Sequence, residues 1–151
     1  METTVHTDDE TRRFAHNLLT VLKGSAKEGG ATVLTLSGPL GAGKTALTKH
    51  LAAILGVTKT VTSPTFVLRC DYDTQDPLFR SLVHIDAYRL NDSEAPTIGW
   101  EEVLSMPDTL VIVEWPEHIA SHIPPHHIPL TASVSGTTRS FTVPEQSRTA
   151  V

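Results

Sequence analysis

Residues 38–45 read Gly-Pro-Leu-Gly-Ala-Gly-Lys-Thr, which matches the phosphate-loop pattern G-x-x-x-x-G-K-[ST] at every fixed position. The apolar and β-branched run at residues 31–36 precedes this loop and predicts a strand that is buried on both faces of a parallel sheet. After the loop, apolar residues recur at helical spacing until Gly56, so a helix is expected there. Strand, glycine-rich loop and helix in this order are typical of a site for a nucleoside triphosphate.

The residue types of the loop explain how it would hold phosphate. Glycines let the backbone amides approach the ligand and point inward at the start of a helix, where they form an anion-binding nest. Lys44 is expected to add a point charge at the β- and γ-phosphates, and the hydroxyl of Thr45 is expected to ligate Mg²⁺. The alternative is a glycine-rich turn that matches by chance, and the correct flanking segments argue against it.

Two further apolar runs end in an acid. Residues 82–86 end at Asp86, and residues 110–114 end at Glu114 in the Walker B arrangement. Ligands of open α/β sheets lie beyond the carboxyl ends of the strands, so both acids are expected near the phosphate loop. Glu114 would complete the Mg²⁺ shell, usually through water, and Asp86 would orient water or a metal-bound oxygen. Each acid alone is also explained as a cap of a neighbouring element.

The segments around these motifs predict the rest of an α/β domain. A helix is expected from about residue 11 to 26, and Gly29-Gly30 is expected to end it. The acids at 8–10 precede it and are better explained as partners of the helix dipole than as ligand contacts. A strand is expected at 67–72, no long helix at 93–96, and one or two helical turns at 100–104. Residues 128–134 and 139–143 predict an antiparallel hairpin added to the sheet, and residues beyond Pro144, in particular 146–151, are expected to be frayed.

The loop at residues 57–66 has two explanations that the residues alone leave open. Thr62, Ser63 and Thr65 lie around Pro64, one element beyond the phosphate loop. Nucleotide switches often place a magnesium or γ-phosphate sensor at such a position. Hydroxyl groups next to a proline are equally explained as caps of a turn.

Composition limits the function classes. The chain has 151 residues, 39% of them hydrophobic and 19% charged, which fits one domain with a proper core. No stretch approaches the length of a membrane span and the first ten residues are polar, so we expect a cytoplasmic protein without a membrane role. Cys70 is the single cysteine, which excludes an internal disulfide. The net charge of −5 offers no strong positive field for a nucleic acid, so any such partner would be held indirectly.

Four histidines, at 118, 122, 126 and 127, raise the possibility of a metal site. The first two lie one helical turn apart. However, prolines break the helix before a third ligand can share its face, and no acid or cysteine set completes a cage. Solvated histidines are therefore the better interpretation.

Four blocks together resemble the bacterial TsaE (YjeE) family: GPLGAGKT at 38–45, TSPTF at 62–66, HIDAYRL at 84–90 and VEWPE at 113–117. The resemblance runs from about Asp8 to Phe141. It implies a three-layer α/β fold, a single P-loop NTPase-like domain with a mostly parallel central sheet and added antiparallel strands. It also implies an ATPase that needs Mg²⁺ and ATP, hydrolyses slowly alone, and acts with the TsaB and TsaD proteins in threonylcarbamoyl modification of the tRNA adenosine next to the anticodon.

The resemblance also implies roles for individual residues. Lys44, Asp86, Glu114 and Thr65 would be catalytic, with Thr65 in a switch-like loop, and Thr45 and Glu114 would serve Mg²⁺. Trp115 would lie beside the nucleotide, Asp8 on the adenine side, and Arg139 would match a basic residue of the late hairpin. The full set of expected nucleotide contacts is Asp8, Gly38, Pro39, Leu40, Gly41, Ala42, Gly43, Lys44, Thr45, Asp86, Trp115 and Arg139.

Two other functions use a similar motif. A small-molecule or nucleoside kinase needs the same loop, lysine and metal, but the chain lacks an arginine-rich segment that resembles a lid. A nucleotide-switched binding module without useful hydrolysis is the other alternative, and the two acids at strand ends argue against it.

Overall fold

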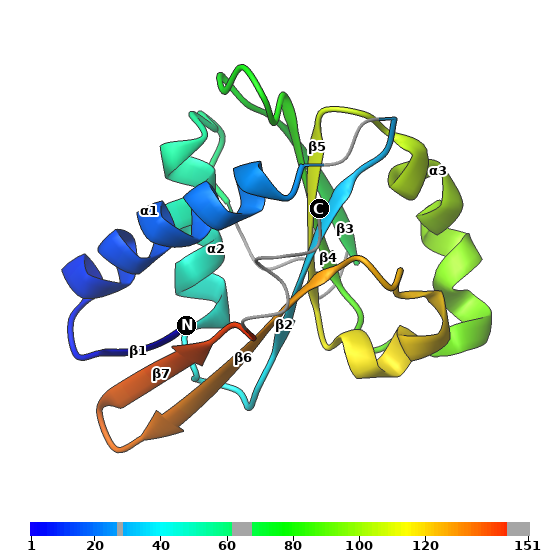
Figure 1. Ribbon diagram of the computed structural model, residues 1–151. Coiled ribbons are helices and arrows are strands. Elements are labelled where there is room, and N and C mark those ends of the chain that lie inside the picture. The colour runs from blue at the N-terminus through cyan, green and yellow to red at the C-terminus, as the bar shows by residue number, and fades with distance from the viewer. Residues whose placement is uncertain (27–28, 62–67, 145–151) are drawn as a thin grey trace.

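The computed structural model describes residues 1–26, 29–61 and 68–144. Within these residues, seven strands form one sheet in the order β1-β7-β6-β2-β5-β4-β3 (Figure 1). The strands are β1 (Glu2–Val5), β2 (Thr32–Ser37), β3 (Arg69–Asp73), β4 (Ser81–Asp86), β5 (Thr109–Glu114), β6 (Ile128–Ser135) and β7 (Thr138–Thr142). The helices are α1 (Asp8–Gly24), α2 (Lys44–Ile54) and α3 (Trp100–Ser105), with the 3₁₀ segments η1 (Asp92–Ile98) and η2 (Pro116–His122).

The centre of the sheet is parallel. Strands β6, β2, β5 and β4 run in the same direction. β3 pairs antiparallel with β4 at one end, and at the other end β7 pairs antiparallel with β6 and β1 antiparallel with β7. Every residue of β5 is buried, as are the first five residues of β2, because helices cover both faces of these strands. The strands predicted at 31–36, 82–86 and 110–114 are confirmed as β2, β4 and β5, with each end within one residue.

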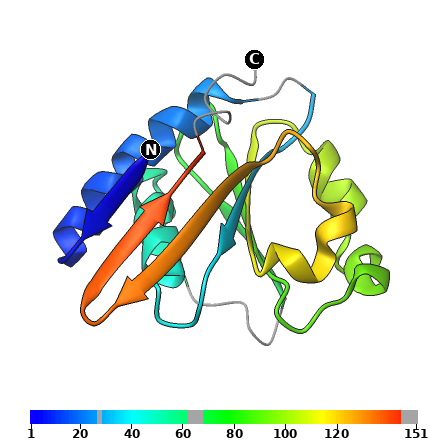
Figure 2. The same ribbon diagram turned by 60° about the horizontal axis from the view of Figure 1, so that its bottom comes forward.

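The fold has three layers, as the resemblance implied. Helices α1 and α2 cover one face of the sheet, and η1, α3 and η2 cover the other (Figure 1). Side chains alternate between the faces along each strand, so one core holds Leu34 and Ile112 and the other holds Val33 and Val111. Figure 2 shows β1, β7 and β6 side by side at one end of the sheet.

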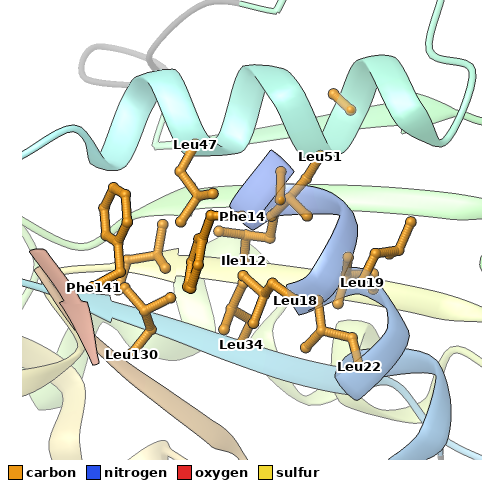
Figure 3. Packing of buried hydrophobic residues seen from close by; sticks show 14 of the residues in the cluster. Phe14, Leu18, Leu19, Leu22, Leu34, Leu47, Leu51, Ile112, Leu130 and Phe141 are labelled. Atoms are coloured by element: carbon orange, nitrogen blue, oxygen red, sulfur yellow. The ribbon is translucent and has the colours of Figure 1, made fainter. Parts of the chain in front are cut away.

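The core under α1 and α2 fixes the helix that follows the phosphate loop. Leu18 and Leu22 from α1 and Leu47 and Leu51 from α2 are fully buried in one cluster with residues of β2 and β5 (Figure 3). The rings of Phe14 on α1 and Phe141 on β7 stack with their centroids 5.0 Å apart. The apolar contacts of Leu47, Leu51 and Ala52 therefore hold α2 against the sheet.

The boundaries of α1 differ from the prediction. The helix begins at Asp8, so the acids at 8–10 form its first turn, and it ends at Gly24 before Gly29-Gly30. Thr7 caps the helix: its hydroxyl accepts a hydrogen bond from the amide of Glu10 at 3.1 Å. The carboxylate of Glu10 accepts one from the amide of His6 at 3.1 Å. This reciprocal capping starts the helix earlier than its apolar face does.

The edge strands extend beyond the sequence prediction. The hairpin of β6 and β7 is confirmed, and β6 joins β2 in parallel register. Strand β1 was not predicted; it pairs antiparallel with β7, and the amide nitrogen of Val143 donates to the carbonyl of Met1 at 2.8 Å. The strand predicted at 67–72 appears as β3 (Arg69–Asp73). Residues 62–66 and the expected frayed end at 146–151 lie outside the described residues.

The segment between β4 and β5 is short and irregular, as its proline predicted. η1 contains Pro96 and starts with a capping box between Asn91 and Glu94, and α3 gives the expected one or two turns. None of the helices within the described residues combines the length and the apolar character that crossing a lipid bilayer requires.

Candidate functional site

The loop at residues 38–43 joins β2 to α2 and lies against β6 and β7. At Gly38, with φ 145°, an added Cβ would lie 2.3 Å from the backbone oxygen of Ala132 on β6. At Gly43, with φ 95°, an added Cβ would lie 3.0 Å from Cδ of Arg139 on β7. Positive φ and these close approaches explain why both positions require glycine. The tip of the loop is open, since Leu40 is 78% exposed.

Lys44 begins α2 and turns back into the loop. Its side chain is buried, and Nζ donates a hydrogen bond to the carbonyl oxygen of Gly38 at 2.6 Å. The same Nζ lies 3.9 Å from the centroid of the Trp115 ring, which gives a cation–π contact. Two neutral groups, a backbone carbonyl and an aromatic ring, therefore hold the ammonium group at the glycine-rich loop.

The surrounding charges oppose the effect of burial on Lys44. Burial lowers the pKa of its ammonium group, and the nearby carboxylates of Glu114, Glu117 and Asp86 act in the opposite direction. The net shift is downward. These interactions also show that the acids at the ends of β4 and β5 lie within electrostatic reach of the loop lysine.

The two predicted acids are neighbours. Asp86 and Glu114 are paired across β4 and β5, and both are buried. The amide of Ala87 donates to the carbonyl of Glu114 at 3.0 Å, which ties the two strand ends together. The carboxylate of Asp86 accepts a hydrogen bond from the amide of Tyr88 at 3.0 Å, which fixes its direction. The expectation that the carboxyl ends of these strands bring both acids to one edge is met.

His84, a buried histidine to which the sequence analysis assigned no role, lies next to these acids. Nε2 of His84 on β4 lies 2.6 Å from Oε2 of Glu114, and the His84 side chain is fully buried. The pleat of a strand puts residues two apart on the same face, so His84 and Asp86 both face α2. In the sequence, the position of His84 two residues before Asp86 was the one indication that it belongs to the site.

Trp115 leads an aromatic group beside Lys44. Its backbone is left-handed, with φ 59° and ψ 50°, directly after β5. The Trp115 ring lies 5.0 Å from that of Tyr88 and 5.9 Å from that of His118, measured between centroids. The indole packs against the core that holds Val111 and Val113 and also contacts Lys44 of the loop.

The remaining predicted residues lie at different distances from the loop. Thr45 is the second residue of α2 and half-buried, and Arg139 contacts the loop at Gly43. Asp8 lies at the start of α1, where its carboxylate is 2.8 Å from Nε2 of His50 on α2, and it is largely exposed. Thr65 lies outside the described residues.

Three of the four late histidines donate hydrogen bonds to backbone carbonyl groups. The ring of His118 donates to the carbonyl of Tyr88 at 2.7 Å, that of His122 to Asp92 at 2.6 Å, and that of His127 to Pro124 at 2.6 Å. Among the residues that the structure describes, no group of three or more histidines, cysteines and acids is placed to hold a metal ion. His118, His122 and His127 are partly buried, so they are less solvated than the sequence suggested.

The donor set nevertheless fits Mg²⁺. This ion prefers oxygen ligands and keeps several waters, so it is bound by one or two protein groups together with phosphate instead of a protein cage. The chain offers suitable oxygen groups in the carboxylate of Glu114 at the end of β5 and the hydroxyl of Thr45 in the first turn of α2.

A parallel sheet, a glycine loop closed by a buried lysine, and acids at two adjacent strand ends define a P-loop NTPase-like protein. The family model described as "Threonylcarbamoyl adenosine biosynthesis protein TsaE" matches residues 5–141. The chain belongs to the TsaE family, a P-loop ATPase-type family of tRNA threonylcarbamoyladenosine biosynthesis.

Relatives and a solved structure agree with this assignment. The chain is 40% identical over 103 residues to the tRNA threonylcarbamoyladenosine biosynthesis protein TsaE of Mycobacterium tuberculosis, covering 64% of this chain and 60% of that protein. It is 38% identical over 105 residues to the Bacillus subtilis protein of the same name, covering 69% and 63%. These matches span less than two thirds of the relatives' length. The crystal structure of YdiB from Bacillus subtilis superposes with a TM-score of 0.71 and 27% identity, covering 95% of this chain and 83% of that one.

Proposed function

We propose that this chain binds and hydrolyses ATP with Mg²⁺ and that this turnover serves threonylcarbamoyl modification of the tRNA adenosine next to the anticodon, together with the TsaB and TsaD proteins. The observation that carries the proposal is the buried ammonium of Lys44, which lies 2.6 Å from the carbonyl oxygen of Gly38 and within electrostatic reach of Asp86 and Glu114. A cation, a glycine-rich loop and two strand-end acids in one place favour binding and cleavage of a polyphosphate.

Each residue of the site has a proposed part in this activity. The backbone amides from Pro39 to Lys44 hold the phosphates at the start of α2, and the Lys44 side chain exchanges its carbonyl partner for phosphate oxygens. When bound, Mg²⁺ would supply positive charge that neutralises the phosphates. Thr45 and Glu114 hold it, and Asp86 orients the attacking water, since its carboxylate is already fixed by the amide of Tyr88.

Four residues complete the proposed nucleotide site. Trp115 covers the nucleotide from the end of β5, and its contact with Lys44 supports this placement. Arg139 approaches the phosphates from β7, which its contact with Gly43 supports. Asp8 serves the adenine side from the start of α1, and Thr65 senses the γ-phosphate or the metal from the loop before β3.

The proposal includes a cycle of association. ATP-bound and ADP-bound chains would differ in affinity for TsaB and TsaD, because only a difference in binding free energy between the two states can drive the complex through a cycle. The chain's net charge of −5 supports indirect rather than direct contact with tRNA. We place this cycle in the cytoplasm.

ATP turnover measured with and without TsaB and TsaD tests the proposal. We expect slow hydrolysis by the chain alone, stimulation by the two partners and nucleotide-dependent co-elution with them. Glu114→Ala and Asp86→Ala are expected to keep nucleotide binding largely intact and to lose turnover. Transfer of phosphate to a small acceptor without stimulation or co-elution would favour a kinase instead.

A further inference from the structure

His84 is a fully buried polar residue at the site for which the proposed mechanism has no use. It lies on β4, two residues before Asp86 and on the face covered by α2. In the register of the sheet, the Cα of His84 is paired with that of Ile112 on β5. Its ring therefore extends along β5 by two residues to contact Glu114. The Nε2 to Oε2 distance of 2.6 Å marks a short, charge-assisted hydrogen bond.

The other ring nitrogen identifies the tautomer. Nδ1 of His84 is the one buried side-chain nitrogen or oxygen without a hydrogen-bond partner within residues 1–26, 29–61 and 68–144. An unpaired N–H in a buried place is costlier and rarer than an unpaired lone pair. The proton therefore belongs on Nε2, where it is donated to the carboxylate, and the bare lone pair belongs on Nδ1.

The hydrogen bond between His84 and Glu114 keeps the carboxylate of Glu114 from bonding directly to the ammonium group of Lys44. Glu114 lies close enough to Lys44 to act on the pKa of its ammonium group. Even so, Lys44 forms its hydrogen bond with Gly38, and Glu114 forms its own with His84. A glutamate has three rotatable side-chain bonds, and the hydrogen bond to His84 is the contact that holds this carboxylate away from a direct bond with the ammonium. A direct ion pair there would occupy both groups that the nucleotide site needs.

We propose that His84 is a positioning residue for Glu114: its Nε2–H holds Oε2 and so presents Oε1 to the metal-bound nucleotide. This inference rests on the proposed function, because it assigns to Glu114 the Mg²⁺ role given above. Partners of this kind orient metal ligands, and their loss typically costs about 10- to 100-fold in metal affinity or activity. The competing explanation is that His84 only satisfies a buried acid and has no effect on the metal.

Three substitutions separate these explanations. His84→Gln keeps a donor near the position of Nε2, His84→Asn places its donor one bond shorter, and His84→Leu has none. For each variant, ATP binding is titrated by calorimetry at rising Mg²⁺, and Mn²⁺ bound in the presence of ADP is followed by electron paramagnetic resonance. Thermal unfolding in chelator without nucleotide reports the purely structural effect.

We expect the Mg²⁺ dependence of ATP binding to depend on whether residue 84 places a hydrogen-bond donor near the position of Nε2. His84→Leu and His84→Asn should raise the Mg²⁺ concentration for half-maximal binding about tenfold or more, with metal-free ATP affinity within about twofold of the unchanged chain. His84→Gln should restore the metal response to within about threefold and also restore the Mn²⁺ spectrum. In a Glu114→Gln background, His84→Leu should have little further effect, because the coupling runs through that carboxylate.

Two outcomes would overturn the inference. One is a Mg²⁺ response in folded His84→Leu equal to that of the unchanged chain. The other is equal impairment in all three variants, which would mean that only the ring matters. If the unchanged chain itself shows no Mg²⁺-dependent binding of ATP, the proposed function fails first, so the two failures are distinguishable.

Discussion

Lys44 is the residue on which nucleotide binding is expected to depend most. Its ammonium is buried in the loop with one carbonyl and one aromatic ring as partners, and the proposed phosphate oxygens would be stronger partners than either. Lys44→Ala removes this charge and should weaken ATP binding more than tenfold, measured by calorimetry with Mg²⁺ present.

Lys49 provides the control on the same helix. It is exposed on α2, and Lys49→Ala should leave ATP affinity within about twofold, because exposed charges are screened by solvent. Unchanged ATP binding by a folded Lys44→Ala chain would exclude the loop as the phosphate site.

Local patterns explain which site residues the sequence could reveal. Lys44 and Thr45 belong to a contiguous motif, and Asp86 and Glu114 each end an apolar run, so neighbouring residues alone indicate them. His84 gains its role from Glu114, 30 positions away in the chain. No local pattern contains that contact, because it depends on the register of β4 against β5.

At the level of elements, β1 and the start of α1 show where local patterns are insufficient. In β1 only Val5 is buried, so the strand lacks an apolar repeat, and its pairing with β7 stabilises it from the far end of the chain. α1 begins before its first apolar residue, because the Thr7 cap and the acid-rich first turn define its start. The central strands were predictable because burial on both faces demands apolar residues throughout.

Asp76 links α1 to the connection between β3 and β4. Its carboxylate accepts hydrogen bonds from Nζ of Lys23 at 2.7 Å and from the amides of Leu78 and Phe79, each at 2.9 Å. Burial acts to raise the pKa of this carboxyl group, but the bonds from Lys23 and the two amides outweigh it and hold the pKa below its usual value. We expect Asp76→Asn to lower the free energy of unfolding at neutral pH by about 1–2 kcal/mol.

The sign of the pKa shift determines the pH dependence of that loss. A carboxyl group whose folded-state pKa is depressed stabilises the fold above its unfolded pKa, and this stabilisation is lost as pH falls through the folded value. The difference between the unchanged chain and Asp76→Asn should therefore shrink on acidification below about pH 4 in chemical denaturation. The matched control is Asp73→Asn, at the exposed end of β3, with an expected change under about 0.5 kcal/mol. A difference that stays constant down to pH 2 would contradict the assignment.

For the whole molecule, the loop lies where the main parts of the fold meet. It connects β2 to α2, its first glycine contacts β6, its last contacts β7, and α2 shares a core with α1. A ligand held there touches elements from both halves of the chain. Its binding free energy should therefore stabilise the global fold and not only the loop.

Thermal unfolding with nucleotide tests this coupling. ATP and Mg²⁺ at about 100 times the dissociation constant should add about 2.7 kcal/mol to the free energy of unfolding. For a domain of this size that corresponds to a rise of roughly 5–10 °C in the unfolding midpoint, measured by calorimetry or intrinsic fluorescence. Mg²⁺ alone should produce almost none of this rise, because the described residues form no cage for the ion. Lys44→Ala should remove most of it at the same ATP concentration, and an equal rise in that variant would place the nucleotide elsewhere.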